Sequence, residues 1–191
     1  MKFRLLYEGE IAPWRKAKIE DIHDIRTKLD PQLRALWRFP PLSIAAPQLL
    51  QYKDKTDPRS IGLAETRGNL AFIPIVSKKV DLQCALDITF LRQQAPGQLI
   101  GEGGDIDNRL KTLLDALSVP PLSQQDWFQK LEFDPNDAIH CLLQDDSLVT
   151  RLGVETDRLL RPTSKRYHLV ALIHVSITAS QLSYANLGIA N

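Results

Sequence analysis

Cysteine is scarce in this chain of 191 residues, because Cys84 and Cys141 are the two present and no CxxC pair occurs. This scarcity argues against a zinc site and against a disulfide framework. The four histidines show no HExxH spacing, and the sequence contains neither a P-loop nor a G-x-S-x-G elbow. Zinc proteases, P-loop nucleotide hydrolases and elbow-type hydrolases therefore lose support.

Long apolar runs are also missing, since no stretch approaches the roughly 18 residues that a membrane span needs. The N-terminal "MKFRLLYE" has too short an apolar run, and a glutamate too early, to predict a signal peptide. We therefore expect a cytoplasmic protein without a membrane partner. Apolar residues make up 43% and charged residues 25%, as in globular proteins, so we expect a single domain over residues 1–191.

The formal net charge of +1 conceals an uneven distribution. Residues 101–157 carry 12 acidic and 4 basic side chains, whereas residues 1–60 carry 8 acidic and 12 basic ones. Residues 158–191 carry 4 basic side chains and no acidic one. An acidic centre between basic flanks is compatible with a cation site edged by phosphate-binding segments, and equally with ordinary surface variation.

Hydrophobic periodicity predicts an α/β (α+β) fold, with helices packed on a mixed β-sheet. The clearest strands are 80–91 and 167–177, in which apolar residues alternate with polar ones. Pro74 places the predicted strand 70–77 at a sheet edge. The other predicted elements are strand 2–8, helices 16–29 and 30–37, and a helix that ends at Leu117. Residues 40–69 look irregular, and residues 122–144 look irregular with at most one helical turn.

The segment "DIDNRLKTLLDAL" (residues 105–117) carries the chemistry. In an extended backbone Asp105 and Asp107 point to the same side, and Asp107 or Asn108 can then cap the helix. Four leucines at helical spacing form its buried stripe, while Asp107, Lys111 and Asp115 follow one another at four-residue steps on a polar stripe. We call Asp107, Lys111 and Asp115 the polar stripe. Together with Asp105, its first residue forms a pair of carboxylates at the start of the helix.

Clustered carboxylates repel one another unless a cation lies between them, and Mg²⁺ prefers oxygen ligands of this kind. A second pair, Asp145-Asp146, precedes a predicted strand, and folding can bring it against the first. Three or four carboxylates around one or two ions form the arrangement that hydrolyses phosphodiesters, with Lys111 contacting the phosphate.

Simpler interpretations stay open at this point. D-x-D sequences are common in loops and helix caps, and Asp145-Asp146 alone is typical of a solvated turn. Lys111 can merely form helix salt bridges with Asp107 and Asp115, each worth about 0.3–0.5 kcal/mol. An EF-hand is excluded, because its glycine and glutamate spacing is absent.

The complete pattern resembles the RusA family of Holliday junction resolvases. In that family the motif reads D-x-D-N-x-x-K, then D-A-L, then D-D before a strand, and this chain fills every one of these positions. The resemblance covers mainly residues 80–177. It departs from the family in the insertions at about 40–69 and 118–144, and in "GEGG" where basic residues are expected before the first aspartate.

The resemblance implies a Mg²⁺-dependent endodeoxyribonuclease, with Mn²⁺ as a possible substitute, that acts on branched DNA such as four-way junctions. Symmetrical cutting further implies a homodimer. The residues that match the family's functional positions are the metal-binding catalytic carboxylates Asp105, Asp107 and Asp146, the essential lysine Lys111, and the supporting residues Asn108, Asp115 and Asp145.

DNA contacts require clusters of Lys and Arg. The candidates are Lys78, Lys79, Arg158, Arg161, Lys165 and Arg166, although solvated turns explain each cluster equally well. The three tryptophans can stack on bases, but core packing is the favoured interpretation. Two other functions stay open: a branched-DNA-binding protein without nuclease activity, and a sugar-nucleotide transferase that uses D-x-D to hold a metal-bound diphosphate.

Overall fold

The computed structural model describes residues 1–51, 54, 56, 60–93, 106–131, 138–165 and 167–189. The strands are β1 (Lys2–Glu10), β2 (Glu65–Arg67), β3 (Leu70–Val76), β4 (Leu82–Arg92), β5 (Ile139–Leu143), β6 (Val149–Arg158) and β7 (His168–Ala179). The α-helices are α1 (Ile19–Leu36), α2 (Leu42–Leu49), α3 (Ile106–Leu117) and α4 (Gln125–Phe128). Single 3-10 turns are η1 (Lys78–Val80), η2 (Leu122–Gln124) and η3 (Asp146–Leu148).

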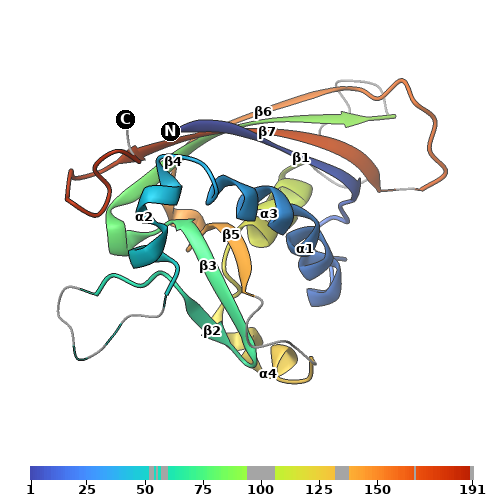
Figure 1. Ribbon diagram of the computed structural model, residues 1–191. Helices are drawn as coiled ribbons and strands as arrows, with labels where there is room; N and C mark the ends of the chain where they lie inside the picture. The colour runs from blue at the N-terminus through green and yellow to red at the C-terminus, as the bar shows by residue number, and fades with distance from the viewer. Residues whose placement is uncertain are drawn as a thin grey trace.

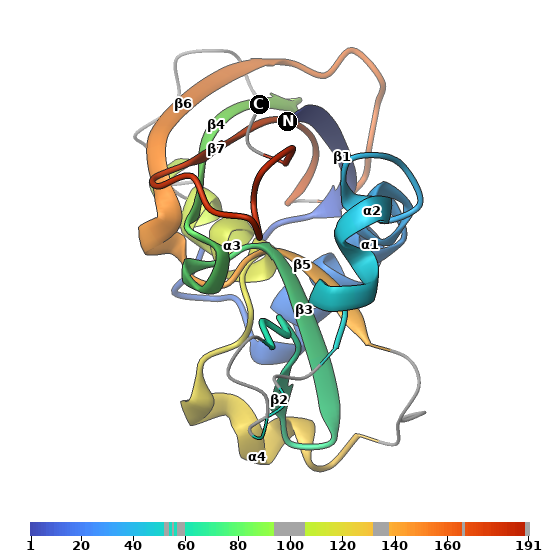
Figure 2. The same cartoon turned by 60° about the vertical axis from the view of Figure 1, so that its left-hand side comes forward.

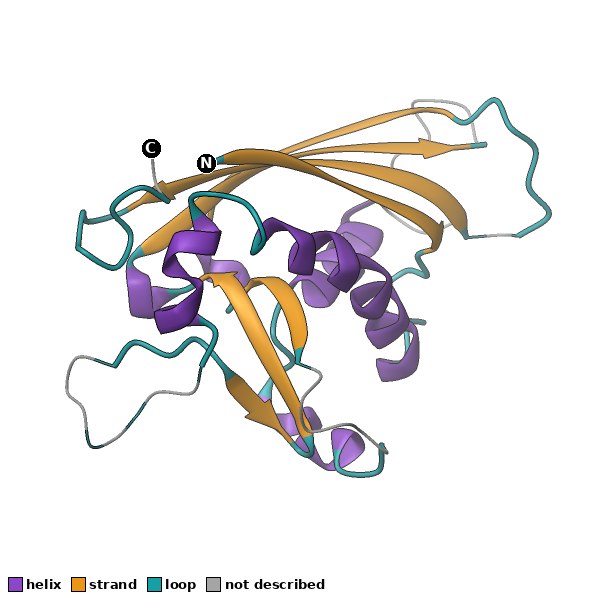
Figure 3. Cartoon of the chain, in the orientation of Figure 1, coloured by secondary structure: helices purple, strands orange, loops and turns teal. Residues whose placement is uncertain are grey.

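Two mixed sheets organise these elements, which confirms the predicted α+β class. The larger sheet has the order β1-β7-β4-β6, with β4 and β6 parallel and the other neighbours antiparallel. The smaller has the order β2-β3-β5, with β3 and β5 parallel. The larger sheet spans the top of Figure 1, and Figure 3 shows α1, α2 and α3 on one of its faces.

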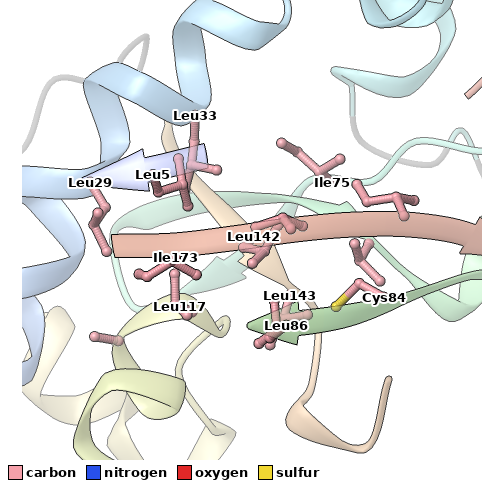
Figure 4. Packing of buried hydrophobic residues seen from close by; sticks show 14 of the residues in the cluster. Leu5, Leu29, Leu33, Ile75, Cys84, Leu86, Leu117, Leu142, Leu143 and Ile173 are labelled. Carbon is pink, nitrogen blue, oxygen red and sulfur yellow. The ribbon is translucent and has the colours of Figure 1, made fainter. Parts of the chain in front are cut away.

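The core lies between the larger sheet and the layer formed by α1, α3 and the smaller sheet. On β4 every second residue from Leu82 to Arg92 is buried, as the predicted alternation requires. Figure 4 shows Cys84 and Leu86 of β4 close to side chains of other elements, such as Ile173 of β7 and Leu143 of β5. Cys84 is thus a core residue, and burial raises the pKa of its thiol to about 12.

Helix α3 packs as its leucine pattern predicts. Leu113 and Leu117 are buried, and Leu110 and Leu114 are partly buried against the same core. The polar stripe follows from this orientation, because it occupies positions of the helix that the leucines leave free.

One helix replaces the two that we predict around Pro31. Helix α1 runs without interruption from Ile19 to Leu36, and Pro31 lies inside it. Asp30 therefore caps no second helix. Its carboxylate instead accepts a hydrogen bond from the backbone N–H of His140 at 2.7 Å and pairs with Arg34 at 3.2 Å. The contact between Asp30 and β5 stabilises a continuous helix where proline alone favours a break.

The segments expected to be irregular contain regular structure. Residues 40–69 include α2 and β2, and residues 118–144 include α4 and β5. Strand β5 is buried along its whole length, so its residues do not alternate and resemble any short apolar run. Strand β3 lies between two neighbours rather than at an edge, but β2 pairs only with Leu70–Phe72 and ends before Pro74.

The two ends of the described chain meet on one side of the larger sheet (Figure 2). The N-terminal amine of Met1 donates to the carbonyl oxygens of Ile177 and Ile189 at 3.1 and 3.0 Å. Within the described residues, none of the helices has the length and apolar character needed to cross a membrane.

A second, smaller cluster lies where α4 packs on β3. Phe128 is fully buried, and its ring contacts those of Phe72, Trp127 and His23 at centroid distances of 5.4, 4.8 and 5.2 Å. We expect Phe128→Ala to lower the free energy of unfolding by about 3–5 kcal/mol, because the lost ring leaves a cavity.

Urea denaturation measures this loss, and Leu122→Ala is the matched control, because that nearby side chain is 65% exposed. The control is expected to change stability by no more than about 0.5 kcal/mol. A loss below about 1 kcal/mol for Phe128→Ala would contradict the packing of α4 described above.

Candidate active site

The polar stripe of α3 lies on the surface where the predicted motif places it. Asp107 and Lys111 are exposed, and Asp115 is half-buried. Along the helix Asp107 and Asp115 are about 12 Å apart at 1.5 Å per residue. Asp105 lies outside the described residues, so its place beside Asp107 stays a prediction.

The second acidic pair follows directly after β5, at the carboxyl end of a parallel strand pair. Asp145 Oδ1 accepts a hydrogen bond from the backbone N–H of Ser147 at 3.0 Å and so begins the turn η3. Hydrogen bonds from Ser147, with a further contribution from the charge of Lys78, lower the pKa of Asp145. Asp146 is exposed at the start of the same turn.

In the folded chain the negative charge of Asp146 acts on Asp115, the last residue of the polar stripe. Burial raises the pKa of the Asp115 carboxyl, and the negative charge of Asp146 raises it further. Lys111 and a hydrogen bond from Trp14 act in the opposite direction, but they do not outweigh the burial. The charges of two residues that are 31 positions apart in sequence therefore interact, whereas the predicted meeting of Asp146 with Asp105 and Asp107 stays a prediction.

The structure describes two of the three predicted metal ligands, Asp107 and Asp146. In the part of the chain that the structure describes, no three His, Cys, Asp or Glu side chains are grouped so that they could hold a metal ion. The predicted trio includes Asp105, which lies outside that part. Asp107 and Asp146 are the described residues that could contribute carboxylate oxygens, from the first turn of α3 and from η3.

Gln144 joins the turn after β5 to the turn after β3. Its Oε1 accepts hydrogen bonds from Ser77 Oγ at 2.8 Å and from the backbone N–H of Lys78 at 3.0 Å. Its Nε2 donates to Glu65 Oε1 at 2.8 Å. These bonds hold Lys78 beside Asp145, so one predicted DNA-binding residue lies next to the second acidic pair. Nothing in the sequence marks Gln144 as a functional residue, since a lone glutamine carries no recognisable pattern.

Lys79 points elsewhere and has structural partners. Its Nζ lies 3.4 Å from Glu65 Oε1 and donates to the carbonyl oxygens of Gly62 and Leu63 at 3.4 and 3.5 Å. These contacts favour a structural role for Lys79 over a DNA contact.

The basic loop between β6 and β7 folds back onto the end of β1. Arg161 pairs with Glu8, and Lys165 Nζ lies 3.8 Å from Glu10. Arg158 is exposed at the end of β6, and Arg166 lies outside the described residues. Exposed ion pairs of this kind are weak, so Arg161 and Lys165 can still exchange their partners for a phosphate.

The first turn of α3 contains a buried arginine, Arg109. The Arg109 guanidinium is stacked over the Tyr167 ring at 5.5 Å, and burial together with the charge of Arg92 lowers its pKa. Because the backbone N–H of Ile11 donates to Tyr167 O at 3.0 Å, β1, the basic loop and α3 meet at this point.

A second buried arginine, Arg26 of α1, anchors the other end of α3. Its Nε donates to Ser118 O at 3.1 Å, and its Nη2 donates to Asp115 O at 2.7 Å. A cation at the C-terminal end of a helix also interacts favourably with the helix dipole. Arg26 interrupts the inward-facing apolar positions of α1, and this interruption was the available sequence signal for a buried charge.

The tryptophans do not behave alike. Trp37 is buried in the core as expected, whereas Trp14 is 43% exposed and lies against α3. Its backbone N–H donates to Asn108 O at 3.0 Å, and Lys111 Nζ lies 4.2 Å from the centroid of its ring. Trp14, Lys111 and Asp115 line a cavity of about 250 Å³.

No family model, no curated protein and no solved structure matches the chain. The resemblance to RusA-type resolvases therefore depends on the motif residues alone.

The raised pKa of Asp115 has a measurable consequence for stability. A carboxyl whose pKa is higher in the folded state than in the unfolded chain binds more protons when folded, so its contribution to stability declines as the pH rises above its ordinary pKa of about 3.9. We expect Asp115→Asn to gain stability relative to the wild type between pH 3 and pH 7, because asparagine does not titrate.

Chemical denaturation of both proteins across this pH range measures the difference. Asp126→Asn, which removes an exposed carboxylate from α4, controls for the loss of one negative charge. If the Asp115→Asn difference is independent of pH or falls as pH rises, the description of the Asp115 environment is wrong.

Proposed function

We propose that the protein is a Mg²⁺-dependent endodeoxyribonuclease that hydrolyses phosphodiester bonds in branched DNA such as four-way junctions. The complete RusA-like motif supports this function. The structural observation that supports it is the effect of the Asp146 charge on Asp115, because the proposed site requires the two separated acidic parts of the motif to lie on the same side of the protein.

The described donor set fits a hard divalent cation. Asp107 and Asp146 offer exposed carboxylate oxygens, which Mg²⁺ prefers as ligands. Around Asp115 the charges of Lys111 and Arg26 lower the pKa of the carboxyl and the charge of Asp146 raises it, so burial is the main cause of the net rise. Asp107, Asp146 and the motif residue Asp105 would hold the ion, which when bound lowers the pKa of a water molecule and offsets charge on the phosphate.

The side chains of the chain itself would bind and orient the DNA strand. Lys111 lies on the polar stripe between the two acidic positions, where its ammonium can donate hydrogen bonds to a phosphate oxygen. Lys78, beside Asp145, extends this positive charge to the other side of the acidic pair. Arg158, Arg161, Lys165 and Arg166 form a more distant phosphate-binding loop in this proposal.

A homodimer is part of the proposal, because symmetrical cutting of a four-way junction requires two active sites. Two-fold symmetry is also the commonest arrangement of soluble oligomers.

Charge-neutral substitutions of the proposed metal ligands test the function. We expect Asp107→Asn and Asp146→Asn each to reduce the cleavage rate of a labelled four-way junction by on the order of 100-fold or more, because each removes a charged group that acts on the transition state. Asp126→Asn on α4 is the matched control and should cleave at the wild-type rate.

Parallel reactions with Mg²⁺, Mn²⁺ and EDTA, on junction, linear duplex and single strand, complete the assay. Full activity of a pure Asp107→Asn preparation would refute the assignment. Binding of the junction without cleavage by the wild type in either metal would instead favour a DNA-binding protein without nuclease activity.

Lys78 allows a separate test of DNA binding. If it neutralises one phosphate, Lys78→Ala should weaken junction binding and reduce the slope of log K against log salt by about 1. The exposed residue Lys130, which follows α4, provides the control Lys130→Ala. Binding is measured in EDTA by fluorescence anisotropy at several salt concentrations, and an unchanged slope for Lys78→Ala would exclude this contact.

A further inference from the structure

Trp14 lies outside the motif, yet it contacts the centre of the polar stripe. It belongs to the segment between β1 and α1, and two hydrogen bonds tie this segment to α3. The backbone N–H of Trp14 donates to Asn108 O at 3.0 Å, and Thr112 Oγ1 donates to Ala12 O at 2.9 Å. The position of the indole relative to α3 is therefore held by the backbone on both sides.

The indole contacts two successive members of the polar stripe. Lys111 Nζ lies 4.2 Å from the ring centroid, within the range of a cation–π interaction. The Trp14 side chain also lines the same pocket as Asp115 and acts to lower the pKa of its carboxyl. A single side chain from another part of the sequence thus contacts both a cation and an anion that are four residues apart on α3.

This arrangement competes with a direct salt bridge. Lysine and aspartate four residues apart on a helix ordinarily pair with each other, which directs the ammonium along the helix surface. Within the described residues, Lys111 instead lies over the indole, and its ammonium remains on the side of the stripe where the 250 Å³ cavity opens.

We propose that Trp14 is a positioning residue that holds the Lys111 ammonium where it can meet a DNA phosphate and keeps it from pairing with Asp115. This inference rests on the proposed nuclease function, in which Lys111 contacts the phosphate. Trp14 acts through Lys111 and has no catalytic role of its own.

The experiment compares Trp14→Leu, which removes the ring and its N–H, with Trp14→Phe, which keeps a ring. We expect Trp14→Leu to lower kcat for junction cleavage about tenfold with little change in KM, and Trp14→Phe to retain most of the activity, because a phenyl ring still attracts the ammonium. In a Lys111→Ala background, Trp14→Leu should cause no further loss, since the residue on which it acts is absent.

Trp127 provides the matched control. Its indole Nε1 also donates to a carboxylate, Glu20 Oε1 at 3.0 Å, but it lies away from the polar stripe. Trp127→Phe should cleave at the wild-type rate. A reduction for Trp14→Leu that persists in the Lys111→Ala background would overturn the proposal, because it would then reflect general damage to the fold.

A spectroscopic measurement separates this proposal from the proposed function. The Lys111 ε-methylene protons lie close to the indole, so their NMR signals should be shifted upfield in the wild type and move downfield in Trp14→Leu. Unchanged signals would refute the contact even if the enzyme is active. If the signals move as expected but the wild type cleaves no DNA with Mg²⁺ or Mn²⁺, the contact stands, whereas the nuclease assignment and the role of Trp14 in it both fail.

Discussion

The end of β5 is the constraint on which the candidate site depends. The backbone N–H of Val119, just after α3, donates to Leu143 O at 2.9 Å, and the N–H of Gln144 donates to Val76 O at 2.8 Å. The last residues of β5 are thus held by α3 on one side and by β3 on the other. Because these bonds are buried between packed elements, the two aspartates that follow have little freedom in where they emerge.

Several consequences follow from this fixed end. Asp145 and Asp146 leave the sheet at the carboxyl ends of two parallel strands, a position where open sheets commonly bind ligands. The side chain of Gln144 extends the constraint to Lys78, and the charge of Asp146 reaches Asp115. An acidic turn that is unremarkable in sequence thus acts electrostatically on a helix that begins 40 residues before it.

Two positively charged residues of α1 and α3, Arg26 and Lys111, have different surroundings and therefore different roles. Arg26 is buried and bound to two carbonyl oxygens at the end of α3, so it serves the fold. Lys111 is exposed and lies on an indole, so its ammonium stays available to solvent and to anions. A buried arginine without such acceptors would be costly, whereas an exposed lysine loses little by forming a cation–π contact.

Local patterns predicted those elements whose burial is one-sided. Strands β4 and β7 alternate because the helices cover one face of the larger sheet, and α3 shows a leucine stripe for the same reason. The same reasoning missed β5, which is buried on all sides, and it divided α1 at Pro31, where contacts between Asp30 and β5 override the local preference. Hydrophobic periodicity indicates which face of a helix or strand is buried. It gives no signal for an element that is buried on all faces.

The sequence by itself determined the members of the motif and the polar stripe, because helical spacing alone puts Asp107, Lys111 and Asp115 on one side of α3. Only the tertiary structure decided that the charge of Asp146 acts on Asp115 of this stripe, and that the Trp14 ring lies beside the Lys111 ammonium. The physical reason is distance along the chain. Neighbours within a helix are set by backbone geometry, whereas contacts across 31 or nearly 100 residues depend on how β1, β3 and β5 pack around α3.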